Sequence, residues 1–464
     1  MRSRVLVAGA LLITALGALV LAFTAGDSGS DAQATPSAGL VTPLWSIRRV
    51  PEPVVEAVGA QHLQAQLDAA APGGGTCFVV NADRHTLATH GADTPLTGAS
   101  TQKLLVAAAA LAILGTDSTF ETRVVASGAP TDGTLDRVWL VGAGDPVLTT
   151  GDYAAFLKSQ PESRSDVITS LETLADAITA KGVRRIPGGI LADDSRYDQE
   201  RYRPSVSDED RRVGQIGPMG ALTVNDGFST WARFSKQGVA NPATNAASRL
   251  TQLLRTRGVD VGPAGAGTAP SATTEIAKIS SPPLHDIVAS MLTSSDNLTA
   301  ELLTKEIGVR VAKQGTTAAG LAAITAKLKE LGVPIADGSL SDGSGLDHAN
   351  RVTCNELVAT IALASRPGMQ ALFDGLPVAG QTGTLSAEFL GSPVVGKLRG
   401  KTGTLVGVTG LAGVVDVGRR LTYAFVDNGE FTKAQGDANH VDVGDIIGRY
   451  PDAPAIDGLV PPPQ

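Results

Sequence analysis

The sequence predicts a mixed α/β protein with more than one domain. Its 464 residues exceed the length at which a single hydrophobic core stops growing. Helical segments rich in Ala and Leu alternate with short apolar runs that are typical of strands. Hydrophobic residues make up 43% of the chain and charged residues 18%, as is ordinary for a folded protein. Aromatic residues account for only 4%, so we expect cores built on Ala, Val, Leu and Ile.

The N-terminal segment has the layout of an export signal. Arg2 and Arg4 precede an uncharged apolar run at residues 5–23. This run is long for a signal peptide and almost long enough to span a bilayer, and a small-x-small cleavage site follows only at residues 32–34. Residues 1–24 are therefore predicted to be a signal peptide or a retained N-terminal membrane anchor. In both cases the rest of the chain is expected outside the cytoplasm.

The first folded elements follow a linker. Residues 25–53 are rich in Gly, Ser, Ala, Thr and Pro, which predicts a flexible linker with little to bury. A short buried strand is expected at residues 77–81. The Ala/Leu-rich run at residues 104–114 is apolar on every side and ends at Gly115, which predicts a buried helix.

The pattern changes between residues 120 and 284 to short β runs, turns and two helices. Strands are expected at 139–142 and 189–192, and helices at 168–180 and 246–255. We interpret this stretch as an inserted accessory region of one or two small α/β subdomains.

Helical patterns return after residue 284. The expected elements are helices at 285–292, 298–311, 317–331 and 355–364, then strands at 394–398, 410–415 and 420–426. The main domain is thus predicted to be discontinuous, formed by residues 54–119 and 285–452. Residues 453–464, which are rich in Pro, are predicted to be a disordered tail.

Several function classes are disfavoured by composition and motifs. The net charge is -8, and no Lys/Arg cluster suggests a nucleic-acid partner. The six histidines show no spacing typical of a zinc hydrolase, and no nucleotide-binding glycine loop is found. We therefore expect neither a metal nor a cofactor. The two cysteines, Cys77 and Cys354, are compatible with a disulfide in an exported chain and equally with two buried thiols.

The first segment with chemical potential is Ser100-Thr101-Gln102-Lys103. Residues three apart share a helix face, so the lysine can reach the serine hydroxyl. Burial among Ala and Leu would lower the pKa of Lys103 and let its neutral amine accept the serine proton. Taken alone, the segment could equally be an N-terminal cap followed by a lysine that extends to solvent.

The second segment is Ser295-Asp296-Asn297, between two expected helices. One interpretation is a cluster of helix-capping residues. In the other, alternate side chains place a hydroxyl and an amide in a cleft, where Ser295 relays a proton and Asn297 binds a substrate amide.

The third segment is Lys401-Thr402-Gly403-Thr404, expected just after the apolar run 394–398. On an edge strand beside a cleft, Lys401 would supply positive potential and the threonines would supply hydroxyl donors. Gly403 would let a substrate backbone approach closely. Residues 381–384 repeat the pattern with Gln in place of Lys, so only the cationic copy is a candidate for binding an anion.

These three segments, in this order, resemble those of the penicillin-recognising serine enzymes, which comprise DD-peptidases and serine β-lactamases. Ser295 lies much farther from Ser100 than in a compact β-lactamase, and no Glu-x-x-Leu-Asn segment lies between them. Further phrases make residues 45–450 similar to the low-molecular-mass class C penicillin-binding proteins, or D-alanyl-D-alanine carboxypeptidase/endopeptidases. These phrases lie at residues 142–146, 189–197, 221–226, 342–346 and 376–385.

The resemblance implies a β-lactamase/transpeptidase-like domain, with an antiparallel sheet flanked by helices and split by the accessory region. Ser100 would attack the penultimate D-Ala carbonyl, with Lys103 as base. Ser295 would pass a proton on, Asn297 would hold the substrate amide and Lys401 would bind its carboxylate.

The resemblance also implies an oxyanion hole formed by the backbone N–H groups of Ser100 and Thr404, with the hydroxyls of Thr402 and Thr404 near the carboxylate. The expected partners are peptidoglycan stem peptides and β-lactam inhibitors, and the expected location is periplasmic, cell-wall associated or secreted. The accessory region is modest in size for this group, which leaves endopeptidase activity open.

Three alternatives remain. A β-lactamase or esterase could use the same scaffold, and a non-catalytic wall-binding homologue could retain the fold. An unrelated Ser-His-Asp hydrolase is disfavoured because no Gly-x-Ser-x-Gly segment is present.

Overall fold

The computed structural model describes residues 52–70, 75–163, 166–233, 235–336 and 338–452. The predicted signal or anchor segment, most of the predicted linker and the predicted C-terminal tail lie outside these residues. Within the described part of the chain, no helix combines the length and apolar character that crossing a membrane requires.

The main sheet joins the two ends of the described chain. Its order is β14-β15-β16-β1-β2, and all neighbouring strands are antiparallel. The strands are β1 (Thr76–Ala82), β2 (His85–His90), β14 (Leu398–Leu405), β15 (Val408–Asp416) and β16 (Arg420–Asn428). Strand β14 therefore lies at one edge of the sheet.

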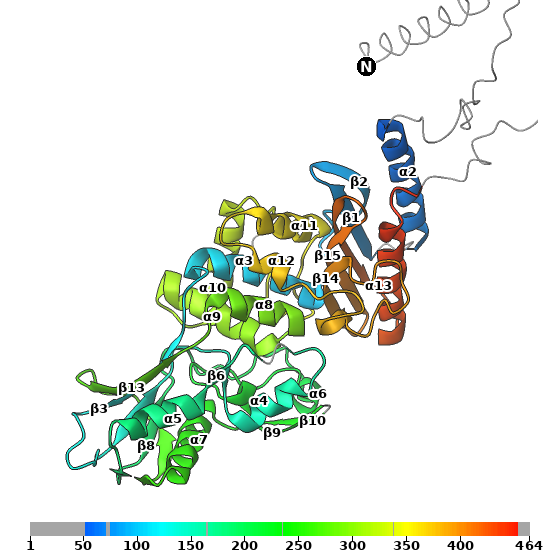
Figure 1. Cartoon of the computed structure of the whole chain (residues 1–464). Coiled ribbons are helices and arrows are strands. Elements are labelled where there is room, and N and C mark those ends of the chain that lie inside the picture. Colours follow the sequence, from blue (N-terminus) through cyan, green and yellow to red (C-terminus); the bar gives the residue numbers. More distant parts are fainter. Residues whose placement is uncertain (1–51, 71–74, 164–165, 234, 337, 453–464) are drawn as a thin grey trace, which may run out of the picture. The chain divides into compact units, whose positions relative to one another are not determined.

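One face of this sheet is covered by α2 (Glu52–Ala70) and α13 (Lys433–Gly448), which lie side by side (Figure 1). Leu67 of α2, Phe78 of β1 and Ile447 of α13 belong to one buried apolar cluster. Burial of these apolar side chains is what holds the two terminal helices on the sheet.

A helical layer covers the other face and contains the central helix α3 (Lys103–Leu114). The surrounding helices are α8 (Leu284–Ser294), α9 (Asn297–Ala312), α10 (Thr317–Glu330), α11 (Cys354–Ala362) and the short α12 (Ala371–Asp374). Residues 103–111 of α3 are all buried, as its apolar surface on every side predicts. A disulfide between Cys77 of β1 and Cys354 of α11 links the sheet to this layer.

The chain between β3 and β13 forms a second sheet with its own apolar core. The order of this sheet is β12-β8-β4-β3-β13, and it packs against α5 (Leu171–Ala180) and α7 (Pro242–Thr256). Its strands are β3 (Glu121–Ala126), β4 (Val138–Val141), β8 (Ile190–Asp193), β12 (Ala264–Ala266) and β13 (Thr274–Ser280). Smaller pairings join β5 (Leu148–Thr149) to β6 (Thr169–Ser170), β7 (Arg185–Ile186) to β11 (Asp260–Val261), and β9 (Phe228–Ala232) to β10 (Ser235–Gly238).

This region contains two helices that the sequence did not predict, α4 (Gly151–Lys158) and α6 (Asp208–Val213). Helix α6 buries none of its residues and is held by a capping box between Ser207 and Asp210, so it carries no apolar period. The predicted helix at 168–180 is also too long. Residues 169–170 form β6, and α5 starts only after Ser170, whose hydroxyl accepts the N–H of Thr173.

The predicted strand at 394–398 is wrong at its beginning. The N–H groups of Lys397 and Leu398 both donate to the carbonyl of Val394, and Gly396 has a φ of +73°. These contacts make a turn, which the apolar composition of 394–398 does not reveal. The strand starts at Leu398, so the segment Lys401–Thr404 lies within β14 rather than after a strand.

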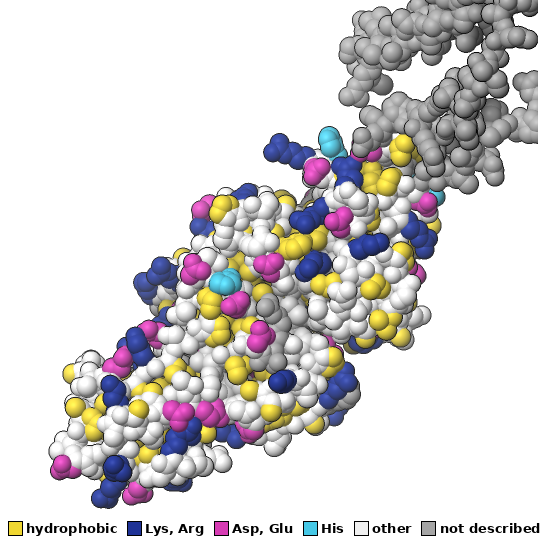
Figure 2. All heavy atoms as spheres, in the orientation of Figure 1, with side chains coloured by type: hydrophobic (Ala, Val, Ile, Leu, Met, Phe, Trp, Pro, Cys, Tyr) yellow, Lys and Arg dark blue, Asp and Glu magenta, His cyan; other side chains and the backbone are white. Residues whose placement is uncertain are grey.

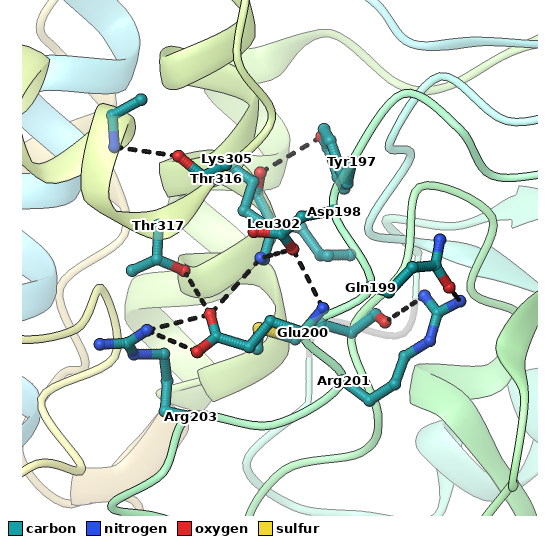
Figure 3. Close-up of polar contacts among 12 residues, drawn as sticks. Tyr197, Asp198, Gln199, Glu200, Arg201, Arg203, Leu302, Lys305, Thr316 and Thr317 are labelled. Carbon is teal, nitrogen blue, oxygen red and sulfur yellow. Dashed lines mark hydrogen bonds and ion pairs between the residues drawn. The ribbon is translucent and has the colours of Figure 1, made fainter.

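Helix α9 is tied to the second region by a polar network around Lys305 (Figure 3). The Lys305 side chain is almost fully buried, and its Nζ contacts Asp198 Oδ1 at 2.5 Å and Glu200 Oε2 at 3.8 Å. Arg203 pairs with Glu200 at 2.7 Å. A buried cation needs such partners because desolvation would otherwise destabilise it strongly.

On the face shown in Figure 2, other charged side chains of both signs are interspersed.

Candidate active site

Ser100 lies in a tight turn directly before α3. It belongs to the short 3₁₀ helix η2 (Ala99–Gln102), and the α-helix begins at Lys103. The backbone N–H and hydroxyl of Thr101 both donate to the carbonyl of Gly98, at 3.2 and 2.7 Å. Ala99 has a φ of +48°, a left-handed conformation that costs a non-glycine residue about 1 kcal/mol or more. The turn leaves Ser100 partly exposed between buried neighbours.

The amine of Lys103 is held by three oxygen atoms. Its Nζ lies 2.8 Å from Ser100 Oγ, 2.6 Å from Asn297 Oδ1 and 2.6 Å from the carbonyl oxygen of Ser344. The amide and carbonyl oxygens can only accept hydrogen bonds, so they take two N–H bonds of the amine. In the neutral amine the remaining direction, towards Ser100, is then occupied by the nitrogen lone pair.

The environment of Lys103 favours this neutral form. Burial lowers the pKa of Lys103 to about 8, although the negative charges of Asp342, Asp296 and Glu301 oppose the shift. A base with a pKa near the working pH combines a useful neutral fraction with enough basicity to accept a proton. Geometry and charge state therefore both suit Lys103 to deprotonate the Ser100 hydroxyl.

A loop that the sequence analysis did not assign to the site supplies the Ser344 carbonyl. Its backbone is bound by two buried carboxylates. Glu301 Oε1 accepts the N–H groups of Gly343 and Ser344, at 3.0 and 2.8 Å, and Asp342 Oδ1 accepts that of Gly345 at 2.7 Å. The signal that could have identified Glu301 is its position four residues after Asn297, on the same face of a helix.

Ser295, Asp296 and Asn297 form the junction between α8 and α9, where both interpretations of this segment apply. Asp296 caps α9 by accepting the N–H of Thr299 at 2.5 Å. Ser295 ends α8 with a φ of +61°. This left-handed turn separates the three side chains, and those of Ser295 and Asn297 face the two lysines of the site.

Lys401 reaches Ser295 from the edge strand β14. Its Nζ donates to Ser295 Oγ and to the carbonyl of Thr402, both at 2.8 Å. Burial, and secondly the positive charge of Lys103, lower the pKa of Lys401 well below its usual value. A bound carboxylate would restore the cationic form by adding an opposite charge.

Gly403 allows another segment to approach β14 closely, but that segment belongs to the protein itself. A methyl group at this position would overlap the carbonyl oxygen of Gly98 and lie 3.1 Å from the Thr101 side chain. The glycine therefore lets β14 pack against the turn that carries Ser100. The expectation that it makes room for substrate backbone is replaced by this contact.

The threonines of β14 lie at the rim of the site. Thr402 Oγ1 is 2.8 Å from Thr384 Oγ1, so the repeat at residues 381–384 lies beside the cationic segment. Thr404 is partly exposed and pairs with Thr409 of β15. The N–H of Gly400 donates to Pro377, away from β15, and N–H groups two residues apart point the same way. The N–H groups of Thr402 and Thr404 therefore face the free edge of β14.

The chain between β3 and β13 reaches this site at Asn297, whose Nδ2 donates to the carbonyl of Gln215 at 2.8 Å. A cavity of roughly 240 Å³ adjoins the α8–α9 junction and is lined in part by Tyr153, Asp226 and Asp296. The hydroxyl of Tyr153 donates to Asp226 at 2.6 Å, and burial followed by the charge of Asp296 raises the pKa of Asp226. No local sequence signal marks Gln215.

A separate group of side chains has the composition of a metal site. Glu388, Asp437 and His440 place one ligand atom each within 4.8 Å of one another. Each already has a partner, since His440 Nδ1 is 3.3 Å from Glu388 and Asp437 pairs with Lys433 at 2.6 Å. We assign no ligand to this group.

Comparison with known proteins agrees with this geometry. The D-Ala-D-Ala carboxypeptidase 3 (S13) family matches the chain over residues 60–238 and 232–446. A carboxypeptidase of Mycobacterium tuberculosis is 32% identical over 345 residues, which cover 72% of each chain. A D-alanyl-D-alanine carboxypeptidase of Actinomadura is 30% identical over 410 residues, which cover 71% of this chain and 73% of the relative.

Solved structures show the same fold. Penicillin-binding protein 4 of Haemophilus influenzae matches with a TM-score of 0.69 at 21% identity, over 82% of this chain and 98% of that protein. A structure of the same protein complexed with a β-lactam matches with a TM-score of 0.60 at 21% identity, over 82% and 97%. The predicted fold class is confirmed by these likenesses and by the antiparallel sheet flanked by helices.

Proposed function

The chain belongs to the D-Ala-D-Ala carboxypeptidase 3 family, and from this premise we propose that Ser100 forms an acyl-enzyme with peptidoglycan stem peptides. The predicted family and enzyme class are confirmed: the chain is a serine-type peptidase of the D-Ala-D-Ala carboxypeptidase kind. The observation that carries the assignment of Ser100 is its 2.8 Å contact with the buried amine of Lys103.

Acylation would begin with neutral Lys103. As Ser100 Oγ bonds to the carbonyl carbon of the penultimate D-Ala, its proton passes to Lys103 Nζ along the existing contact. The resulting tetrahedral intermediate collapses when the C–N bond to the terminal D-Ala breaks. The leaving nitrogen takes up the proton that Lys103 accepted, relayed through the Ser295 hydroxyl, so that Lys103 is neutral again and an ester on Ser100 remains.

In deacylation, a water molecule would act as the nucleophile and the Ser100 oxygen as the leaving group. Lys103 accepts a proton from water as its oxygen attacks the ester carbonyl, and the Ser100 oxygen leaves with that proton. These steps use only water and side chains of the chain itself.

Backbone and side-chain donors would bind the rest of the substrate. The N–H groups of Ser100 and Thr404 would stabilise the oxyanion, and the outward direction of the Thr404 N–H at the free edge of β14 supports this role. Lys401 and the hydroxyls of Thr402 and Thr404 would bind the terminal carboxylate. Asn297 would use its second amide N–H for the substrate amide, since the first is donated to Gln215.

We also propose the predicted division into a discontinuous catalytic domain (54–119 and 285–452) and an inserted accessory region (120–284). Two observations support it: the second sheet has an apolar core of its own, and it pairs with no strand of the main sheet. The contact between Gln215 and Asn297 supports a role of the accessory region as a wall of the cleft.

Peptidoglycan lies outside the cytoplasm, which supports an extracellular or periplasmic location. We propose that residues 1–24 direct export and that the catalytic part is periplasmic, wall-associated or secreted. Fusing residues 1–53 to a reporter that is active only after export tests this, with Arg2 and Arg4 replaced by Glu as the control. A cytoplasmic reporter in both fusions would refute it.

Labelling with a fluorescent penicillin tests the assignment of the nucleophile, and the β-lactam complex of the Haemophilus relative supports this choice of probe. The wild type should be labelled covalently and Ser100→Ala should not. Ser294→Ala is the matched control, because the Ser294 hydroxyl donates to the carbonyl of Ser290 within its own helix α8. Equal labelling of Ser100→Ala would refute the assignment.

Release of D-Ala from a pentapeptide, compared with cleavage of a cross-linked dimer, then measures carboxypeptidase against endopeptidase activity. We propose carboxypeptidase activity, because the similar proteins carry that name; cleavage of the dimer would add endopeptidase activity. A β-lactamase is the competing function on this scaffold, and rapid turnover of penicillin without D-Ala release would favour it.

A further inference from the structure

The buried carboxylate of Glu301 does not contact Ser100 or Lys103, yet it connects the two elements that hold the lysine amine. One acceptor of the amine, Asn297 Oδ1, belongs to the first turn of α9. The other, the carbonyl of Ser344, belongs to the loop at residues 342–345. Their relative position decides which direction remains for the lone pair of Lys103.

Glu301 joins this loop to α9. It lies one turn after Asn297 on the same helix, and its Oε1 accepts the backbone N–H groups of both Gly343 and Ser344. The residue is completely buried, and its second oxygen, Oε2, has no hydrogen-bond partner. Leaving a buried carboxylate oxygen unpaired is costly, and a structural cap for two N–H groups would not require an acid.

We propose that Glu301 is a positioning residue for the general base, fixing the Ser344 carbonyl relative to Asn297 so that Lys103 directs its lone pair at Ser100. This inference rests on the proposed role of Lys103. Asp342 complements Glu301 in the loop by accepting the N–H groups of Gly345 and Asp347, both at 2.7 Å.

The charge of Glu301 has a second consequence at the same place. Its negative charge is one of three that raise the pKa of Lys103 against burial, together with those of Asp342 and Asp296. Lys401 faces the same site, but burial and the charge of Lys103 lower its pKa well below the usual value and disfavour its cationic form. Burial and the charge of Asp342 raise the pKa of Glu301 to about 7, against the positive charge of Arg203, so Glu301 carries its negative charge mainly above that pH. Removing the charge of Glu301 while keeping its shape should therefore lower the pKa of Lys103.

Two substitutions separate position from charge. Glu301→Gln keeps an oxygen acceptor for the loop, so its acylation rate at pH 8 should stay within about threefold of the wild type. The acid limb of its pH profile should move to lower pH, because more Lys103 is neutral there. Glu301→Ala releases the loop, and its acylation rate should fall about 10- to 100-fold, as a misplacement on the order of 1 Å can cause.

The matched control is Glu306→Gln, farther along the same helix. Glu306 is also buried, but it pairs with Arg196 at 2.6 Å and with Tyr197 at 3.0 Å, away from the loop. The Glu306→Gln variant should melt at a lower temperature, and its acylation rate should depend on pH as in the wild type.

The rate constant of acylation by a fluorescent penicillin, measured from pH 5.5 to 9.5 on variants shown to be folded by circular dichroism, decides the matter. If both Glu301 variants keep the wild-type rate and pH profile while the wild type is labelled on Ser100, the positioning role is refuted and the proposed function stands. If the wild type is not labelled on Ser100, the proposed function itself fails. Should Glu301→Ala not fold, an unshifted profile in Glu301→Gln would still contradict the effect of charge.

Discussion

Lys401 Nζ lies 2.8 Å from Ser295 Oγ and so joins the edge strand of the main sheet to the junction between α8 and α9. This contact connects the sheet with the helical layer. The Lys103–Ser100 contact, also 2.8 Å, is a second amine–hydroxyl pair. Each pair suits proton transfer, because both groups can donate and accept when the amine is neutral.

Acylation should depend on pH through Lys103. Because burial lowers its pKa to about 8, the reactive neutral form predominates above that pH and is lost as the pH falls. Between pH 8 and pH 6 the acylation rate constant should fall on the order of 50-fold, following the neutral fraction. Stopped-flow labelling with fluorescent penicillin measures this. A flat profile would exclude Lys103 as the base.

Replacing Lys401 should weaken recognition of the substrate carboxylate. Lys401→Gln should lower kcat/KM for a peptide ending in D-Ala-D-Ala about 10- to 100-fold, the value of a hydrogen bond to a charged group. The same peptide with a C-terminal amide is the control and should lose less. Equal losses for both peptides would show that Lys401 acts on the reaction and not on the carboxylate.

Gly403→Ala should disturb the contact between β14 and the Ser100 turn. The added methyl group overlaps Gly98, so strand and turn must separate, at a cost of about 1–3 kcal/mol in unfolding free energy. Penicillin labelling should slow as well. Gly128→Ala is the control, since nothing lies within 4 Å of a methyl group there. Unchanged stability and labelling of Gly403→Ala would contradict the tight contact.

The disulfide should stabilise the protein. Cys77 and Cys354 are separated by 277 residues, and removing a disulfide that closes a loop destabilises folded proteins by about 2–5 kcal/mol. Cys77→Ala/Cys354→Ala should therefore melt at lower temperature and still be labelled on Ser100 at 25 °C. Thiol titration of the unfolded, unreduced wild type should detect no free thiol, and two free thiols would refute the bond.

Much of the fold is predictable because it depends on local patterns of apolar residues in the sequence. The helix at 104–114 and the strand at 77–81 are recognisable from composition alone, since each is buried on all sides or in a continuous apolar run. The start of β14 cannot be recognised in this way, because the turn at 394–397 contains apolar residues that are also typical of a strand. Helix α6 was not predicted for the opposite reason: it buries none of its residues and so shows no apolar pattern.

The sequence by itself determined which groups we propose to react. Ser100, Lys103, Ser295, Asn297 and Lys401 stand out as short segments of fixed spacing. In the structure, hydrogen bonds join Ser100, Lys103 and Asn297 in one group and Ser295 and Lys401 in another. Only the tertiary structure decided their partners: Ser344 at Lys103, Glu301 at Ser344, Gln215 at Asn297, Gly98 against Gly403, and the bond between Cys77 and Cys354. The physical reason is that local sequence encodes which groups can react, whereas their contacts join residues far apart in the chain and are set by how sheet and helices pack.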